Sequence, residues 1–481
     1  MAPRSSMELG LKHPMYRSMM HELVRWKGDP GRKALLLRGE RQVGKTTLVR
    51  KFAADHYDSY AEFNFYESAK DRELFENSRS LDDLMVAISL SREGFSMTKD
   101  NGLLFLDEIQ ECPEALTAVK FIVQKCDVDV ILSGSMLGCG FKIPRSFPVG
   151  SITFRDMHPM TFEEFLLSQG VDKTIPDMIR MHVRERRPFG EATFDVLQSL
   201  FREYMIVGGM PECVLRYTLD KGDMDAVITA QKDIVSSYRS DIVSYAPARM
   251  KQSVSKEFEL IPSQLSRRNK KVVFSEIDQQ TNVGLREYGG TIGWMIESRF
   301  VNPCYNISAL EHPLEEHIVC KSVKMYSNDT GLLLSMMGRD TMMAILDGDT
   351  SVNEGAITEN IVMQMMIACG QKVYYFETNR DGAPRLEVDF ITMLGSELAA
   401  IEVKSGKYRR SSSIRKLKET PYGTNVRRYI KFYNGNIIGD DPEFEHYPLF
   451  CAGFMDAMHN PSKPVMPERP SGFVDMLSGR V

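Results

Sequence analysis

The sequence has no long hydrophobic run. Its longest strongly apolar stretches, "ALLL" and "LLFL", are far too short to span a bilayer, and the N-terminal stretch lacks the apolar core of a signal peptide. The eight cysteines of the 481-residue chain are scattered, and none has the spacing of a zinc-binding or redox pair. We therefore expect a cytoplasmic protein with buried thiols and no contact with a membrane.

The chain as a whole also lacks an excess of positive charge. Its net charge at pH 7 is -5, so any contact with a nucleic acid has to come from local basic patches. Two stretches stand out, residues 267–271 with Arg267, Arg268, Lys270 and Lys271, and residues 404–431 with ten lysines or arginines. We expect DNA as the partner of these patches; the alternative is a pair of solvated basic surfaces. No protein partner can be named from the sequence.

Short apolar runs do alternate with amphipathic stretches between residues 33 and 155. The runs "KALLLRG", "YAEFNFYE", "GLLFLDE", "VDVILSGS" and "SITFRDM" are typical of strands. After the first run, "KTTLVRKFAADHY" places Leu48, Val49, Phe52 and Ala53 on one helical face. The alternation predicts an α/β domain over residues 1–158, with a parallel sheet covered by helices.

The first predicted strand leads into a phosphate-binding sequence, "GERQVGKT" at residues 39–46. Its glycines let backbone N–H groups face phosphate oxygens, and the helix that follows adds its positive end. Lys45 is placed to reach the terminal phosphates and the Thr46 hydroxyl to ligate Mg²⁺. The expected nucleotide contacts are Gly39, Gln42, Val43, Gly44, Lys45, Thr46, Thr47, Ser133 and Ser135.

Two carboxylates end the third predicted strand, in "LLFLDEIQ". Asp107 can hold Mg²⁺ through water, and Glu108 can polarise the attacking water, so we expect Lys45, Asp107 and Glu108 to be catalytic. The sequence has no Asn-Lys-x-Asp base reader for guanine, which favours ATP over GTP. Arg145, Arg155 and Arg202 are candidates by position for the arginine that completes charge neutralisation; otherwise a neighbouring subunit supplies it.

Beyond residue 158 we expect four further parts. Residues 159–250 are mainly helical, beginning with a capping box at Thr161 and Glu164 and broken by "VGGMPE". Residues 251–326 have the helix and hairpin order of a winged helix, with Ser275 capping one helix. Residues 327–450 form a second α/β unit, and residues 451–481 form a tail whose prolines recur every three residues, as in polyproline II.

Taken in order, the motifs resemble a prokaryotic family of AAA-type ATPases that carry a C-terminal domain of unknown function. The matching stretches include "GERQVGKTTL", "LLFLDEIQ", "MTFEEFL", "GGMPE", "KMYSNDTGLL", "GAITEN", "EVDF" and "IEVKSG". The resemblance implies a P-loop ATPase core of the AAA/RecA type, a helical lid, a winged helix and a C-terminal fold similar to the PD-(D/E)XK nucleases. Members usually have Gly-Arg before "MTFEEFL"; this chain has Gly150-Ser151, which puts the role of that arginine in doubt.

The C-terminal half carries a second candidate site. On one predicted strand Glu387 and Asp389 share a face opposite Leu386, Val388 and Phe390, and on the next Glu402 and Lys404 share a face. If the strands are neighbours, Asp389 and Glu402 converge as metal ligands and Lys404 can orient a water. With Glu359 from the preceding helix, this is the arrangement that the resemblance implies for a nuclease.

Three functions follow from these motifs. The first is a magnesium-dependent ATPase that acts as a switch or remodeller on DNA. The second is a metal-dependent nuclease gated by ATP, in defence or mobile-element biology. The third is a nucleotide switch that binds a protein partner. ATP and Mg²⁺ are the expected cofactors in all three.

Overall fold

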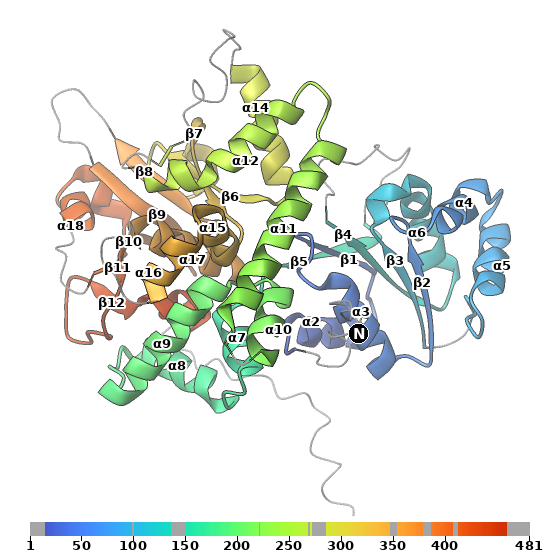
Figure 1. Ribbon diagram of the computed structural model, residues 1–481, viewed down its shortest axis with the longest axis horizontal. Helices are drawn as coiled ribbons and strands as arrows, with labels where there is room; N and C mark the ends of the chain where they lie inside the picture. Colours follow the sequence, from blue (N-terminus) through green and yellow to red (C-terminus); the bar gives the residue numbers. More distant parts are fainter. Residues whose placement is uncertain are drawn as a thin grey trace, which may run out of the picture.

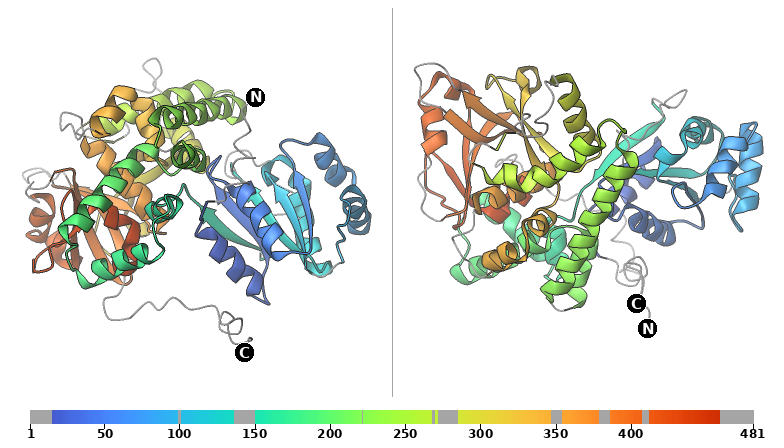
Figure 2. Two further views of the ribbon diagram at one scale, coloured as in Figure 1. Left: turned by 60° about the horizontal axis from the view of Figure 1, so that its bottom comes forward. Right: turned by 45° about the horizontal axis from the view of Figure 1, so that its top comes forward.

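The computed structural model describes residues 15–98, 101–135, 150–220, 222–267, 270–271, 285–346, 354–378, 386–406 and 412–458. Figure 1 shows two sheets at opposite ends of the molecule, with helices between them. In Figure 2 these helices, drawn in green, separate the blue N-terminal sheet from the orange and red C-terminal sheet. The fold is therefore α/β, with each sheet forming its own layered unit.

The N-terminal sheet has five parallel strands in the order β2-β3-β4-β1-β5. The strands are β1 (Ala34–Gly39), β2 (Ser59–Asn64), β3 (Gly102–Asp107), β4 (Asp129–Gly134) and β5 (Ile152–Met157). The predicted parallel sheet is confirmed, including its fifth strand. Because parallel strands end at the same edge, the carboxyl ends of β1 and β3 bring residues 39–46 close to Asp107.

Helices cover both faces of this sheet. They are α2 (Met19–Gly28), α3 (Lys45–His56), α4 (Ala69–Asn77), α5 (Leu81–Ser91), the short 3-10 helix η1 (Ile109–Glu111) and α6 (Pro113–Lys125). The predicted apolar face of α3 is buried and packs with Leu35 and Leu37 of β1, whereas Leu36 packs with the α6 side. Ser68 and Ser80 cap α4 and α5 by accepting backbone N–H groups of their first turns.

A helical segment follows β5. It contains α7 (Phe162–Ser168), α8 (Thr174–Glu185), α9 (Glu191–Val207), α10 (Pro211–Leu219), α11 (Met224–Tyr245) and α12 (Lys251–Ser266). The capping box of Thr161 and Glu164 is present at the start of α7, as the sequence predicts. The 22-residue helix α11 runs through the centre of the molecule, beside the N-terminal sheet (Figure 1).

The C-terminal sheet has seven strands in the order β12-β11-β10-β9-β8-β6-β7. The strands are β6 (Val301–Ile307), β7 (Ile318–Ser327), β8 (Tyr374–Thr378), β9 (Leu386–Leu394), β10 (Glu397–Lys404), β11 (Arg428–Tyr433) and β12 (Glu445–Pro448). The helices of this part are α14 (Leu285–Glu297), η2 (Leu314–His317), α15 (Thr330–Met337), α16 (Arg339–Leu346), α17 (Glu354–Ala368), α18 (Ser412–Lys418), η3 (Pro421–Asn425) and η4 (Leu449–Met458).

The expected winged helix over residues 251–326 does not stand apart from this sheet. Its hairpin is present as β6 and β7, but β6 also pairs in parallel with β8. The expected boundary between residues 326 and 327 therefore falls inside one sheet, because pairing between strands distant in sequence leaves no local pattern. Ser275, the expected helix cap, lies outside the described residues.

Strand β9 departs from strict alternation. Leu386 and Val388 pack on one side of the sheet, but Phe390 packs in the other core cluster with Ile401. A register shift between β8 and β9 accounts for the change of face, since an extra residue reverses the side-chain direction. The prediction that Leu386, Val388 and Phe390 share one face is therefore wrong for Phe390.

The expected tail over residues 451–481 is also wrong at its beginning. Residues 449–458 form η4, whose Cys451, Ala452, Phe454 and Met455 are buried. Phe450 packs against Phe189 and Phe201 of the helical segment, which explains why this stretch is held in the core. The prolines from Pro461 onward lie outside the described residues.

Across the described parts of the chain, no helix combines the length and apolar character needed to cross a membrane.

Candidate functional site

The phosphate-binding sequence forms a tight loop between β1 and α3. Gln42 and Gly44 have positive φ angles, 67° and 89°, which turn successive backbone N–H groups toward the same side. Gly39 lies against β5, and a Cβ there would come within 2.2 Å of the Met157 carbonyl oxygen. The loop therefore needs glycine at Gly39 for a close backbone approach and at Gly44 for its left-handed conformation.

Lys45 lies at the first position of α3 and is only 5% exposed. Its Nζ donates to the carbonyl oxygens of Gly39 and Glu40, at 3.0 and 2.8 Å. Burial lowers the pKa of Lys45, and the carboxylates of Glu108, Glu40 and Asp107 oppose that effect. The ammonium group is thus held over the loop, where a phosphate oxygen would give it a stronger acceptor than a carbonyl.

Asp107 ends β3 directly beneath the loop. The Thr46 hydroxyl donates to its Oδ2 at 2.9 Å, and the Ser133 hydroxyl donates to its Oδ1. Burial, together with the nearby Glu108, raises the pKa of Asp107 to about 6, while these two hydrogen bonds lower it. A hydroxyl and a carboxylate in this contact are the ligand pair that Mg²⁺ takes in phosphate loops, the carboxylate acting through water.

Glu108 follows Asp107 in a left-handed backbone conformation, with φ 52° and ψ 53°. Its Oε2 accepts hydrogen bonds from the Gln110 amide at 2.5 Å and the Ser135 hydroxyl at 2.9 Å. Its backbone N–H donates to Ser133 Oγ at 3.3 Å. The two serines at the end of β4 thus orient the two acidic residues; their expected contact with the nucleotide itself stays a prediction.

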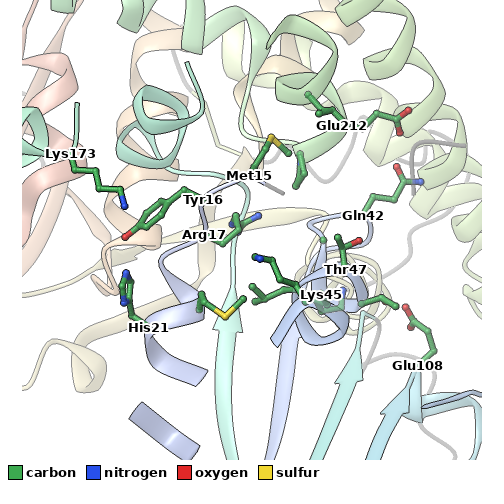
Figure 3. Close-up of a pocket in the computed structure, with 17 residues that line it drawn as sticks. Met15, Tyr16, Arg17, His21, Gln42, Lys45, Thr47, Glu108, Lys173 and Glu212 are labelled. Carbon is green, nitrogen blue, oxygen red and sulfur yellow. The ribbon is translucent and has the colours of Figure 1, made fainter. Parts of the chain in front are cut away.

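A cavity of about 850 Å³ opens beside the loop. Gln42, Gly44, Lys45, Thr46, Thr47 and Glu108 line it, and so do the N-terminal segment and the start of α10. Figure 3 shows Lys45 and Thr47 at the floor, with Tyr16 and Glu212 on the facing walls. The volume is in the range of nucleotide-sized ligand sites. Val43 is buried beneath the loop and does not line the cavity.

The N-terminal segment is the part of the site that sequence reasoning missed. Arg17 donates to the Val43 carbonyl at 2.8 Å and to the His158 carbonyl at 2.6 Å. Its Nε lies 3.3 Å from Glu164 of the capping box, whose Oε1 also accepts from the Ser18 hydroxyl. Arg17 therefore fixes the loop to the end of β5 and to α7. A single arginine before a helix has no pattern that would have revealed this role.

The arginine candidates lie away from the cavity where they are described. Arg155 is within β5 and faces Glu22 at 3.5 Å, and Arg202 is exposed on α9. Ser151, the position where the sequence departs from the pattern it resembles, precedes β5 at the amino end of the strand. Six strand residues separate it from the phosphate edge, about 20 Å, so a side chain there cannot reach the phosphates of the same chain. Arg145 lies outside the described residues.

The second candidate site is assembled on β9, β10 and α17. Strands β9 and β10 are antiparallel neighbours with Phe390 opposite Ile401, which places Asp389 beside Glu402. Asp389 Oδ2 accepts the Val403 N–H at 2.9 Å, and Lys404 Nζ lies 2.8 Å from Glu402 Oε1. Burial and the charge of Glu359 raise the pKa of Asp389 to about 6, against the opposing effects of Lys404 and Lys324.

Lysines are interleaved with the carboxylates of this second site. The pairs are Lys270 with Glu359, Lys271 with Glu377, Lys324 with Glu387, and Lys404 with Glu402. Over the described ranges, no group of three or more His, Cys, Asp or Glu side chains is arranged to hold a metal ion. The predicted residues therefore lie close together, but the paired lysines neutralise the carboxylate charge that would bind a metal cation.

The two basic patches differ in what they present. In the first, Lys270 and Lys271 are engaged by glutamates, and Arg268 lies outside the described residues. In the second, Arg428 is held by Glu445 and Lys418 lies 3.4 Å from Glu443, but α18 exposes Arg415 and Lys416. Lys407, Arg409 and Arg410 also lie outside the described residues. Among the described basic residues of this second patch, Arg415, Lys416 and Arg427 are exposed.

Three family models match consecutive parts of the chain. Residues 31–166 match an AAA domain, residues 198–342 a domain of unknown function (DUF8612), and residues 354–442 another domain of unknown function (DUF4143). A search of curated proteins gave no match.

Several solved structures are similar at low identity. The Walker-type ATPase PABY2304 of Pyrococcus abyssi is 14% identical, with 67% of this chain and 96% of that chain covered and a TM-score of 0.43. Drosophila ORC bound to DNA is 12% identical, with 71% and 97% covered and a TM-score of 0.29. The RuvB Holliday junction branch migration motor of Thermotoga maritima is 15% identical, with 62% and 89% covered and a TM-score of 0.27.

All three TM-scores are below 0.5, so these likenesses carry no conclusion about ligands or partners. The match over residues 31–166 coincides with the five-stranded parallel sheet, the phosphate loop and the two acidic residues described above. Residues 31–166 match the model of an AAA domain, and this match supports an AAA-type, ATP-binding ATPase.

Proposed function

We propose that the chain binds ATP with Mg²⁺ at residues 39–46 and hydrolyses it. The observation that carries the proposal is the cluster at the carboxyl edge of the first sheet. There Lys45 lies over the loop carbonyls, Thr46 contacts Asp107, and Glu108 faces the same cavity. A positive group, a metal-ligating pair and a base for water, brought to one cavity, are the parts that phosphoryl transfer requires.

The loop would hold the phosphates through its backbone N–H groups and through Lys45. Lys45 would exchange the carbonyls of Gly39 and Glu40 for phosphate oxygens, a change that needs only side-chain movement. Thr46 and Asp107 would hold Mg²⁺, which supplies positive charge to the phosphate oxygens. The apolar wall of Met15, Met20, Pro211 and Leu215 would enclose the base.

In the proposed hydrolysis, Glu108 acts as the base that accepts one proton. A water oxygen forms a bond to the terminal phosphorus, the bond from phosphorus to the bridging oxygen breaks, and ADP leaves with that electron pair. Glu108 accepts a proton of the water, and Ser135 and Gln110 keep its carboxylate turned toward the site. The products are ADP and inorganic phosphate, so no further reactant is needed.

We further propose that the nucleotide cycle switches the position of the helical segment relative to the C-terminal sheet. Pro211 and Glu212 line the cavity, and two residues earlier the Gly209 N–H donates to Asp329 of the C-terminal part at 2.6 Å. The cavity and the C-terminal part of the chain are therefore joined by one short stretch, from Gly209 to Glu212. The exposed basic residues of α18 favour a nucleic acid as the object of the switch.

A metal-dependent nuclease is the alternative proposal for the second site. What supports it is the approach of Asp389, Glu402 and Lys404 on neighbouring strands, with Glu359 close enough to raise the pKa of Asp389. Binding of a divalent cation there would require the glutamates to leave their lysine partners. Cutting of plasmid DNA by the wild type and not by Asp389→Ala would support this alternative.

Release of inorganic phosphate from ATP tests the main proposal. The wild type should turn ATP over in the presence of Mg²⁺, and Lys45→Ala should not. Lys51→Ala is the matched control, because Lys51 lies on the same helix and cavity wall but pairs with Asp55 at 3.1 Å. Equal turnover by the wild type and Lys45→Ala would refute the assignment of the site.

A further inference from the structure

One charged residue of the phosphate loop is not explained by the proposed function. Arg41 lies between Gly39 and Gly44, and its guanidinium is engaged by Asp241 of α11. The same guanidinium lies 5.0 Å from the ring centroid of Tyr66, a residue that is half exposed. An arginine at the centre of a loop that wraps phosphates is thus bound by a carboxylate of another segment, 200 positions away in sequence.

The carboxylate that holds Arg41 is not fully satisfied. Asp241 is 5% exposed, and its Oδ2 has no hydrogen-bond partner among the described residues. Burial raises the pKa of Asp241 to about 6, an effect that Arg41 opposes and the charge of Glu108 reinforces. The ion pair therefore offsets a buried charge incompletely, and a phosphate group with more acceptor oxygens would compete well for the guanidinium.

Arg41 also lies within electrostatic reach of the base for water. Burial lowers the pKa of Arg41, but the charge of Asp241 and, to a smaller extent, the charge of Glu108 raise it, so that the pKa is raised overall. In Figure 3 Gln42, the next residue, stands on the same side of the cavity as Glu108. Two further arginines lie beside the loop. Arg17 is held by the Val43 and His158 carbonyls, and Arg299 pairs with Asp156 on β5, on the opposite side of β1 from β3.

Helix α11 contacts the loop at two further points. The Gln42 amide donates to Ser237 Oγ at 3.2 Å, and the Tyr238 hydroxyl donates to the Arg41 carbonyl at 3.2 Å. Farther along α11, the Gln231 amide donates to the carbonyls of Ile206 and Val207, at 2.7 and 3.1 Å. The helix therefore connects the phosphate loop with the end of α9.

We propose that Arg41 is the phosphate-contacting arginine of the site, supplied by the same chain, and that Asp241 holds it while no nucleotide is bound. When ATP binds, the guanidinium transfers from Asp241 to the terminal phosphate, and α11 loses its charged contact with the loop. This inference rests on the proposed ATPase function and extends it. Arg41 then has two roles. It neutralises charge on the terminal phosphate, and its release from Asp241 transmits nucleotide binding to the helical segment.

The inference predicts opposite effects of two substitutions on the affinity for AMP-PNP, a non-hydrolysable analogue of ATP. Arg41→Ala should weaken AMP-PNP binding about tenfold and leave ADP binding within about threefold, because only the analogue carries a terminal phosphate. Asp241→Asn should strengthen AMP-PNP binding at least about threefold, because the arginine is no longer held elsewhere. The turnover number of Arg41→Ala should fall at least about 100-fold.

Calorimetric titration with AMP-PNP and with ADP, followed by phosphate-release kinetics, tests the inference. Arg32→Ala is the matched control, because Arg32 pairs with Asp129 at 2.5 Å in the same domain but at the amino edge of the sheet. A purely structural pair would make Arg41→Ala and Asp241→Asn change AMP-PNP affinity in the same direction, and that result would overturn the inference. So would a turnover number for Arg41→Ala within about threefold of the wild type.

The outcomes separate this inference from the function on which it rests. A wild type that binds and hydrolyses ATP, beside an Arg41→Ala variant that does so equally well, overturns the role of Arg41 alone. A wild type that binds neither nucleotide overturns both. If Arg41→Ala does not fold, the increase in affinity expected for Asp241→Asn still decides the question, and an unchanged or weaker affinity counts against the inference.

Discussion

Asp329 joins the helical segment to the C-terminal part, and its removal should be strongly destabilising. The residue is fully buried at the N-cap of α15, where its side chain accepts the N–H groups of Leu332 at 2.9 Å and Gly209 at 2.6 Å. The fit is close, since a Cβ on Gly208 would come within 2.2 Å of Asp329 Oδ1. Asp329→Ala removes the acceptor of these two buried N–H groups and of the Gln364 amide, which lies 3.4 Å from Asp329 Oδ2.

The magnitude follows from these contacts. Loss of an N-cap costs about 1 kcal/mol, and a buried donor left unsatisfied costs about 1–3 kcal/mol. We therefore expect Asp329→Ala to lower the free energy of unfolding by about 2–4 kcal/mol. Asp329→Asn keeps one acceptor oxygen and removes the buried charge, so its loss should be less than about half as large.

The pH dependence separates the wild type from both variants, because neither variant has the ionisable carboxyl group. Burial raises the pKa of Asp329 from the ordinary 3.8 to about 6 in the folded protein, so the native state holds a proton that the unfolded chain releases. This contribution to stability is present at low pH and is lost as the pH rises toward about 6. The free energy of unfolding of the wild type should therefore rise relative to that of Asp329→Asn when the pH is lowered from 7 to 5.

Urea unfolding followed by tryptophan fluorescence measures these differences, since Trp26 and Trp294 report on the N-terminal part and on α14. Asp195→Ala is the control, because Asp195 is exposed in the middle of α9 and caps no helix. Its effect should stay within about 0.5 kcal/mol. An Asp329→Ala variant as stable as this control would refute the reasoning about the buried N-cap.

Further predictions concern the two sites. Glu108→Gln should bind ATP with unchanged affinity but hydrolyse it at least about 100-fold more slowly, because only the proton acceptor is lost; retained turnover in a phosphate-release assay would contradict this. Because the pKa of Asp107 is raised to about 6 and its carboxylate is the form that holds Mg²⁺, kcat/KM for ATP should fall as the pH drops from 7 to 5; a flat profile would speak against Asp107 as the ligand. Reversing the charge of α18 with Arg415→Glu and Lys416→Glu should weaken binding of a labelled DNA duplex at low salt, measured by fluorescence anisotropy; unchanged anisotropy would exclude α18 as the contact.

The sequence predicts the N-terminal sheet well because its signals are local. Near-continuous apolar runs mark β1, β3 and β4 as buried parallel strands, and the face of α3 follows from the spacing of Leu48, Val49 and Phe52. The contact of Thr46 with Asp107 also follows, because both residues occupy the carboxyl edge of parallel strands. Composition and spacing are sufficient to predict the contacts of a residue when its position at the end of a strand determines its neighbours.

What the sequence does not reveal depends on contacts between distant segments. The pairing of β6 with β8, the register shift in β9 and the burial of η4 have no local pattern. The same holds for Arg17, which is an ordinary arginine until the fold brings the Val43 carbonyl to it. The lysines of the second site were visible in sequence, but their pairing with glutamates was not.

Calorimetric titration of the wild-type protein with ATP and Mg²⁺ tests the central claim most directly. The account predicts saturable heat with one site per chain, and loss of that heat in Lys45→Ala while Lys51→Ala binds normally. The absence of heat from the wild type, or the same binding curve for Lys45→Ala, would contradict it.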